Sequence, residues 1–212
     1  MRLNKNDLLL YAVTDRSRLI EKSLLQYIEQ AAEGGATMLQ LREKDLSHEE
    51  FLAEAVEVRA LCEKLGLPLI INDDVEIAVA CGAQGVHVGQ SDMEAGDVRL
   101  RIGTDMILGV SAQTVEQALL AEKRGADYLG VGAVFSTSTK KDADDVSLET
   151  LKSICEAVSI PVVAIGGIGP DNIEKLKDSG IDGVAVVSAI FAQRDPMAAA
   201  ENLRRLAEKY FS

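Results

Sequence analysis

The segment "KRGADYLGV" at residues 123–131 contains the unit that decides the fold: a helix end, a glycine, a small residue, a polar residue and a short apolar strand. The same order recurs in "EGGATMLQL" at 33–41, "ACGAQGVHV" at 80–88 and "DSGIDGVAV" at 178–186. A glycine at this place suits the left-handed residue that commonly follows a helix. Repeated helix–strand units of this kind build a closed barrel of parallel strands.

Short apolar runs alternate with longer amphipathic segments along the whole chain. This alternation predicts strands at Leu8–Thr14, Thr37–Arg42, Leu67–Asn72, Gly85–Val88, Met106–Ser111, Tyr128–Val134, Val162–Ile165 and Gly183–Ser188. It predicts helices at Ser23–Gly34, Ser47–Leu65, Val75–Cys81, Ala95–Ile102, Thr114–Arg124, Ser147–Ala157, Pro170–Ser179 and Pro196–Tyr210. No linker or low-complexity stretch divides the chain, so we predict a single domain over residues 1–212.

Strict alternation suits both a closed barrel and an open doubly wound sheet. The strand count of eight favours the barrel, and so do the polar residues that follow nearly all the strands rather than one switch point. No GxGxxG follows the first strand, where a dinucleotide-binding fold would place it. The predicted fold is therefore α/β, a (β/α)8 TIM barrel.

The composition restricts the partners and the compartment. The formal net charge is −12, whereas nucleic acids and anionic membranes require a basic surface, so neither partner is expected. The three cysteines, Cys62, Cys81 and Cys155, show no CxxC spacing, and the chain shows no signal sequence or long apolar run. These features predict reduced thiols in a cytoplasmic protein. The sequence is compatible with a homo-oligomer but does not require one.

Cationic side chains follow the second predicted strand, in "QLREK" at 40–44. Gln40 and Arg42 share a face because strand residues alternate, and Lys44 lies just beyond. Two cations and an amide suit a diphosphate. The alternative is a solvated loop in which Arg42, Glu43 and Lys44 pair with one another, but a position at a strand end favours a functional role.

Carboxylates follow the third and fourth predicted strands. Asp73 and Asp92, at neighbouring strand ends, could share a Mg²⁺ ion whose other ligands are phosphate and water. Helix N-capping is the alternative for Asp74 and Asp92. Capping suits Asp74 well, since it immediately precedes a helix, whereas for Asp92 the two interpretations stay open.

The fifth predicted strand ends at Ser111, which would either hydrogen-bond a substrate or cap the next helix. A serine hydrolase is not indicated, because "GVSAQ" at 109–113 is not a GxSxG elbow. His48 begins a polar helix and is expected at the surface. His87 lies within an apolar strand and is predicted to be an interior, hydrogen-bonded histidine rather than a base or a metal ligand.

The segment "FSTSTKKDADD" at 135–145 replaces the short loop expected after the sixth strand. Its hydroxyl groups and lysines suit phosphate oxygens, and loops at this end of a barrel carry function. The alternatives are a flexible polar loop and a lid that excludes water. The residues concerned are Thr137, Ser138, Thr139 and Lys140.

Glycines follow the seventh predicted strand, and a serine ends the eighth. Gly166 and Gly167 would let a phosphate approach backbone N–H groups, and Ser188 is the last residue of the eighth predicted strand. The loops after strands seven and eight form the recurring phosphate site of such barrels, where a helix N-terminus adds its dipole. We therefore predict a monophosphate here, opposite a diphosphate and Mg²⁺.

The sequence resembles the thiamine-phosphate synthase family through nearly its whole length. The matching segments are "YAVTD" (11–15), "QLREK" (40–44), "IIND" (70–73), "GVHVGQSD" (85–92), "GVSAQT" (109–114), "FSTSTKKD" (135–142), "AIGGI" (164–168) and "VVSAI" (186–190). The resemblance implies condensation of 4-amino-2-methyl-5-(diphosphooxymethyl)pyrimidine with 4-methyl-5-(2-phosphooxyethyl)thiazole, with release of diphosphate. One departure is Ser136, where the family commonly has proline.

The resemblance also implies roles for individual residues. The pyrimidine diphosphate would be held by Gln40, Leu41, Arg42, Glu43, Lys44, Asn72, Ser111 and Lys140, of which Arg42, Lys44, Ser111 and Lys140 would be catalytic. The thiazole phosphate would be held by Thr137, Ser138, Thr139, Gly167, Val187 and Ser188. One Mg²⁺ ion would be bound by Asp73 and Asp92.

Three other functions fit the same scaffold less well. A thiazole tautomerase needs an acid–base histidine at the mouth, where this chain has Ser111. A non-catalytic phosphate-binding barrel has no reason to place Mg²⁺ carboxylates opposite a cationic cluster. A phosphosugar isomerase or indole-type barrel needs a Glu or Lys base, which the first and fifth predicted strands do not offer.

Overall fold

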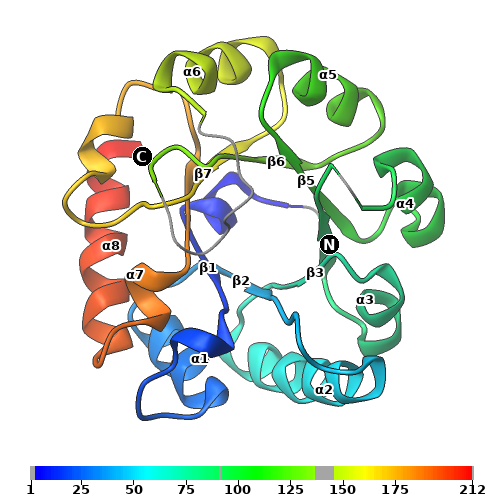
Figure 1. Cartoon of the computed structure of the whole chain (residues 1–212), viewed down its shortest axis with the longest axis vertical. Helices are drawn as coiled ribbons and strands as arrows, with labels where there is room; N and C mark the ends of the chain where they lie inside the picture. The colour runs from blue at the N-terminus through cyan, green and yellow to red at the C-terminus, as the bar shows by residue number, and fades with distance from the viewer. Residues whose placement is uncertain (1–2, 91, 137–145, 212) are drawn as a thin grey trace.

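The computed structural model describes residues 3–90, 92–136 and 146–211. Within them, eight parallel strands close into a barrel in the order β1 to β8, and helices surround the ring of strands (Figure 1). The predicted (β/α)8 barrel is confirmed. The strands are β1 (Leu10–Val13), β2 (Met38–Leu41), β3 (Leu69–Asn72), β4 (Gly85–Val88), β5 (Ile107–Ala112), β6 (Tyr128–Val131), β7 (Val162–Ile165) and β8 (Gly183–Val186).

The helices follow the strands in turn. They are α1 (Leu24–Glu33), α2 (His48–Leu65), α3 (Val75–Cys81), α4 (Ala95–Ile102), α5 (Val115–Lys123), α6 (Leu148–Ala157), α7 (Ser188–Phe191) and α8 (Pro196–Phe211), with 3-10 turns η1 (Lys5–Leu8), η2 (Arg16–Arg18) and η3 (Ile173–Leu176). Within the described residues, none of these helices has the length and apolar character needed to cross a membrane.

Local signals explain where several helices begin and end. Ser47 starts α2 with a capping box, accepting from the Glu50 N–H while the Glu50 carboxylate accepts from the Ser47 N–H. Gly66 ends the same helix at φ 67°, a left-handed conformation that costs glycine little. Asp74 accepts from the Ile77 N–H at 2.9 Å and caps α3, so the capping interpretation of this residue is confirmed.

Alternating strand residues divide the core into two parts. One face of each strand packs against the helices, as Leu39 and Leu41 of β2 do, and forms the larger cluster. The opposite faces fill the barrel interior. The interior cluster consists of Leu8, Tyr11, Val13, Met38, Ile70, Ile107, Tyr128, Val163 and Ala185.

The N-terminal turn η1 lies inside the ring of strands, where Figure 1 shows it in dark blue. Its last residue, Leu8, is fully buried within the interior cluster. A side chain at Gly183 of β8 would overlap the Leu8 carbonyl, so η1 and the start of β8 are in close contact. The turn therefore fills the end of the barrel at which the strands begin. The predicted strand from Leu8 included this residue wrongly, because its apolar character reflects interior packing.

Two predictions near the C-terminal end of the barrel differ from the structure. The helix predicted at Pro170–Ser179 is reduced to η3, because the Asn172 side chain accepts from the Gly169 N–H at 2.9 Å and donates to the Gly167 carbonyl at 2.8 Å. Such side-chain bonds hold the backbone in a turn and delay helix formation. The strand predicted to reach Ser188 ends at Val186, and Ser188 instead begins α7.

Candidate active site

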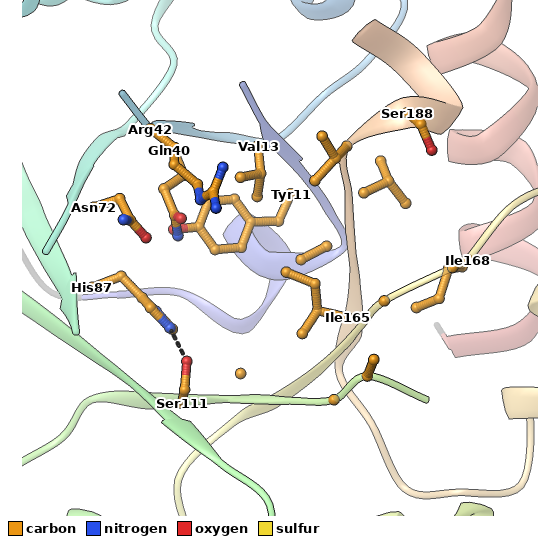
Figure 2. Close-up of a pocket in the computed structure, with 18 of the residues that line it drawn as sticks. Tyr11, Val13, Gln40, Arg42, Asn72, His87, Ser111, Ile165, Ile168 and Ser188 are labelled. Atoms are coloured by element: carbon orange, nitrogen blue, oxygen red, sulfur yellow. Dashed lines mark hydrogen bonds between the residues drawn. The ribbon is translucent and has the colours of Figure 1, made fainter. Parts of the chain in front are cut away.

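A cavity of about 270 Å³ opens at the carboxyl ends of the strands. Figure 2 shows Gln40, Arg42 and Asn72 together on one side of it and Ser188 on the opposite side. The lining residues come from all eight strands or the loops that follow them. They are Tyr11, Val13, Gln40, Arg42, Asn72, His87, Gln90, Ser111, Gln113, Gly130, Gly132, Ala133, Ile165, Gly166, Gly167, Ile168, Ala185, Val186, Val187 and Ser188.

The end of β2 provides an amide and a guanidinium group. Gln40 is only 4% exposed and donates from Nε2 to the Tyr11 hydroxyl at 2.8 Å, which orients its amide. The backbone N–H of Arg42 donates to the Thr14 hydroxyl at 2.9 Å. This bond anchors the start of the loop to the neighbouring strand end, with both Gln40 and Arg42 facing the cavity.

The other residues of "QLREK" lie apart from the cavity lining. Leu41 is fully buried in the outer core, so only its backbone can contact a ligand. The Glu43 carboxylate pairs with Arg16, 3.4 Å away, and burial raises the pKa of this carboxyl above its usual value. Lys44 is exposed and does not line the cavity. The structure thus brings Gln40 and Arg42 together in the cavity and leaves Lys44 outside its lining.

Asp73 and Asp92 lie close together beside the Arg42 side of the cavity. The pKa of Asp73 is raised from 3.8 to about 6, first because surrounding protein displaces water and then because Asp92 is near; the Asn72 amide and Arg42 oppose the shift. Asn72 Nδ2 donates to Asp73 Oδ2 at 2.6 Å. Asp92 Oδ2 accepts from the Gly89 N–H at 2.6 Å, whereas Glu94 caps α4, so the capping alternative for Asp92 is wrong.

Ser111 lies inside β5 rather than at a helix start. Thr114 caps α5, so the capping alternative for Ser111 is wrong. The Ser111 hydroxyl lies 3.0 Å from His87 Nε2 (Figure 2), and the Ser111 carbonyl accepts from Gln90 Nε2 at 2.6 Å. His87 is 8% exposed and hydrogen-bonded, as predicted for an interior histidine, and it also lines the cavity.

Small residues form the opposite side of the cavity. Gly166 and Gly167 adopt φ 101° and φ 63°, and a Cβ atom on Gly167 would lie 2.6 Å from the Ser136 carbonyl. Val187 and Ser188 lie at the start of α7 and also face the cavity. The predicted ligands Thr137, Ser138, Thr139 and Lys140 lie outside the described residues.

Some lining residues were not predicted from the sequence. Tyr11 looks like a core residue because it stands in the apolar run of β1, and only the barrel register shows that it faces inward at the cavity floor. Gln90 and Gln113 occupy loops after β4 and β5. Their signal was available, because both follow strands whose carboxyl ends converge.

The fold and the cavity are those of a (β/α)8 barrel in which Gln40, Arg42 and Asn72 line one side of the cavity at the strand ends and Gly166 and Gly167 line the other. A model of the thiamine monophosphate synthase family matches residues 10–190. Thiamine-phosphate synthase of Clostridium tetani is 53% identical over 201 residues, covering 94% of this chain and 96% of that protein. Thiamine-phosphate synthase of Ruminiclostridium cellulolyticum is 55% identical over 200 residues, covering 94% and 95%.

A solved structure agrees with these matches. Thiamine phosphate pyrophosphorylase from Pyrococcus furiosus superposes with a TM-score of 0.90 at 39% identity, covering 98% of this chain and 99% of that one. The chain therefore belongs to the thiamine monophosphate synthase family. The resemblance inferred from its motifs is confirmed.

Proposed function

We propose that the protein condenses 4-amino-2-methyl-5-(diphosphooxymethyl)pyrimidine with 4-methyl-5-(2-phosphooxyethyl)thiazole to form thiamine phosphate and diphosphate. The observation that supports the proposal is that two different groups of residues suited to bind anions line opposite sides of one cavity. Arg42 and Asn72, beside the two carboxylates, face Gly167 and Ser188. One molecule of each substrate can then lie between them with its reacting atom near the centre.

The residues present fit a Mg²⁺ ion. Asp92 lies close enough to Asp73 to raise the pKa of the Asp73 carboxyl, and a divalent cation held by both side chains would offset that effect. Within the described residues, no group of three or more His, Cys, Asp or Glu side chains is placed to hold a metal. Two carboxylates leave positions for water and phosphate oxygens, which is the usual arrangement for Mg²⁺. When bound, the ion would neutralise charge on the departing diphosphate.

The proposed reaction is dissociative. The bond between the pyrimidine methylene carbon and the diphosphate oxygen breaks, and the diphosphate takes both electrons. The aminopyrimidine ring delocalises the resulting cation, and the thiazole nitrogen then donates its electron pair to form the new C–N bond. Arg42, which lines the cavity, stabilises the charge that develops on the leaving group. The family resemblance assigns the same role to Lys44 and Lys140. The reaction requires no side-chain nucleophile.

The test is an assay with both phosphorylated substrates, with and without Mg²⁺. We expect thiamine phosphate and diphosphate to appear in equal amounts, only when both substrates and Mg²⁺ are present. Lys44→Ala should reduce turnover. Lys152→Ala should not, because Lys152 is an exposed residue of α6 that pairs with Glu156. Conversion of a thiazole isomer without any pyrimidine would identify a tautomerase instead, and ligand binding without turnover would identify a non-catalytic barrel.

A further inference from the structure

A continuous row of hydrogen-bonded side chains crosses the barrel interior from β2 to β5. Gln40 Nε2 donates to the Tyr11 hydroxyl at 2.8 Å, and the Tyr11 and Tyr128 hydroxyl oxygens lie 2.8 Å apart. Tyr128 lies 3.0 Å from His87 Nδ1, and His87 Nε2 lies 3.0 Å from the Ser111 hydroxyl. We call these five residues the interior chain. Both of its ends, Gln40 and Ser111, line the cavity.

Two glycines make room for the interior chain. In the strand register, Gly109 of β5 is paired with His87 on one side and with Tyr128 on the other. A Cβ atom on Gly109 would overlap the Tyr128 ring and His87 Nδ1. A Cβ atom on Gly130 would lie 3.0 Å from His87 Cε1. The Tyr128–His87 contact therefore depends on both positions lacking a side chain.

The environment keeps the two tyrosines neutral. Tyr11 is 1% exposed and Tyr128 is fully buried. Desolvation raises the pKa of both hydroxyl groups above the ordinary tyrosine value. Each hydroxyl therefore keeps its single hydrogen, and a buried hydrogen without an acceptor is costly.

These constraints give the hydrogen bonds a direction. The amide nitrogen of Gln40 can only donate, so Tyr11 accepts from it. In the first direction, Tyr11 donates to Tyr128, and Tyr128 donates to His87 Nδ1. His87 then carries its proton on Nε2 and donates it to the Ser111 hydroxyl. In the reverse direction, Tyr11 would accept twice, and its own hydrogen would be left in the barrel interior. The first direction gives each buried hydrogen of the interior chain an acceptor.

We propose that Tyr128 is a positioning residue which, through His87, leaves the hydrogen of the Ser111 hydroxyl free to be donated to an acceptor atom of the pyrimidine substrate. This inference rests on the proposed function and adds a role for residues that do not contact the reacting atoms. It makes Ser111 a donor toward a ring nitrogen or a phosphate oxygen. In the reverse direction, Ser111 would donate to His87 and could only accept from the substrate.

The direction can be measured without any turnover. The chain has two histidines, and His48 is exposed near Asp74, so His48→Gln leaves His87 as the only histidine signal. In protein labelled with ¹⁵N-histidine, we expect the nitrogen chemical shifts to show a proton on Nε2 and none on Nδ1. A proton on Nδ1, alone or together with one on Nε2, would overturn the proposal. This result does not depend on which reaction the protein catalyses.

The kinetic test uses Tyr128→Phe, which removes the hydroxyl and keeps the ring. We expect the KM for the pyrimidine substrate to rise roughly three- to tenfold, as for the loss of one hydrogen bond, with the thiazole KM unchanged. Ser111→Ala should have an effect at least as large, and the double variant should be no worse than Ser111→Ala. Additive losses would show that Tyr128 does not act through Ser111 and would overturn the proposal.

Tyr27→Phe is the matched control. Tyr27 is 1% exposed, and its hydroxyl donates to the Gln193 carbonyl at 3.0 Å, outside the cavity lining. The Tyr27→Phe variant should have lower thermal stability with neither KM changed. A rise in KM equal to that of Tyr128→Phe would show that Tyr128 has only a structural role.

Inhibition by inorganic diphosphate identifies the substrate atom that accepts from Ser111. Weaker inhibition of Ser111→Ala than of the wild type assigns the acceptor to the diphosphate, and unchanged inhibition assigns it to the ring. If the wild-type protein forms no thiamine phosphate, the proposed function fails while the ¹⁵N measurement stands.

Discussion

The two sides of the cavity present different groups to a ligand. The side formed by β2 and β3 presents the long or charged side chains of Gln40, Arg42 and Asn72, with the carboxylates of Asp73 and Asp92 close to Arg42. The side that follows β7 presents Gly166 and Gly167, where a ligand could approach the backbone. If the proposed function is correct, binding on the first side depends on charge, and so on Mg²⁺ and pH, whereas binding on the second depends on space. Substitutions should therefore affect the two sides in different ways.

The largest effect is expected on the charged side, from Asp92→Ala. If Mg²⁺ binds between Asp73 and Asp92, loss of one ligand removes several kcal/mol of transition-state stabilisation, so turnover should fall by about a thousandfold. Asp92 is exposed, and its carboxylate accepts a hydrogen bond from the backbone N–H of Gly89 in the loop after β4. The melting temperature should therefore change little. Steady-state kinetics and thermal denaturation measure the two effects. Full activity in this variant would remove the metal assignment.

A smaller, selective effect is expected on the glycine side, from Gly167→Ala. The new Cβ atom would meet the Ser136 and Phe135 carbonyls at 2.6 and 2.7 Å, and φ 63° is unfavourable for alanine. The KM for the thiazole phosphate should rise by about tenfold, because the loop must shift. Gly169→Ala is the control, since its Cβ atom meets nothing within 4 Å. A rise in the pyrimidine KM alone would mean that the two sides have been assigned the wrong way round.

The smallest effect is a pH dependence of stability at Asp73. Its pKa is raised from 3.8 to about 6, so the folded protein binds more protons than the unfolded chain between these values. The contribution of this carboxyl to the free energy of unfolding is therefore favourable at low pH and is lost as pH rises through about 6.

Without Mg²⁺, the Asp73→Asn variant should have a melting temperature about 1–2 °C higher than the wild type at pH 7, and no such increase at pH 4.5. The effect is small because solvent screens the charge of an exposed side chain. Added Mg²⁺ should reverse the order at pH 7, since it stabilises only a protein that retains the carboxylate. Thermal denaturation at both pH values, with and without Mg²⁺, measures this. An equal difference at both pH values would contradict it.

The sequence predicted the barrel because each repeat carries its own signals. The helix–glycine–strand order recurs from Glu33 to Val186, and strand alternation placed Gln40 and Arg42 on the inner face correctly. The same alternation points Leu41 outward, and the outer core is where the structure places it. Asp74 was recognisable as a cap because it immediately precedes α3.

What the sequence could not predict depends on contacts between distant strands. Tyr11 and Tyr128 each look like core residues within an apolar run, and their hydroxyl contact requires the register of β1 and β6 on opposite sides of the interior. Asp73 and Asp92 could be proposed as partners, but their proximity depends on how the loops after β3 and β4 turn. The shortened helix after β7 depends on one side chain, Asn172, which bonds to the loop instead of allowing a helix to start.

The position of the turn η1 has a consequence for how ligands reach the cavity. Among the described residues, Leu8 and its neighbours in the interior cluster fill the end of the barrel at which the strands begin, so the cavity opens toward the carboxyl ends of the strands. A compound bound on the cavity floor, against Tyr11 and His87, would be covered by a second compound bound nearer the mouth. If the two substrates bind at different depths in this way, the deeper one would have to bind first.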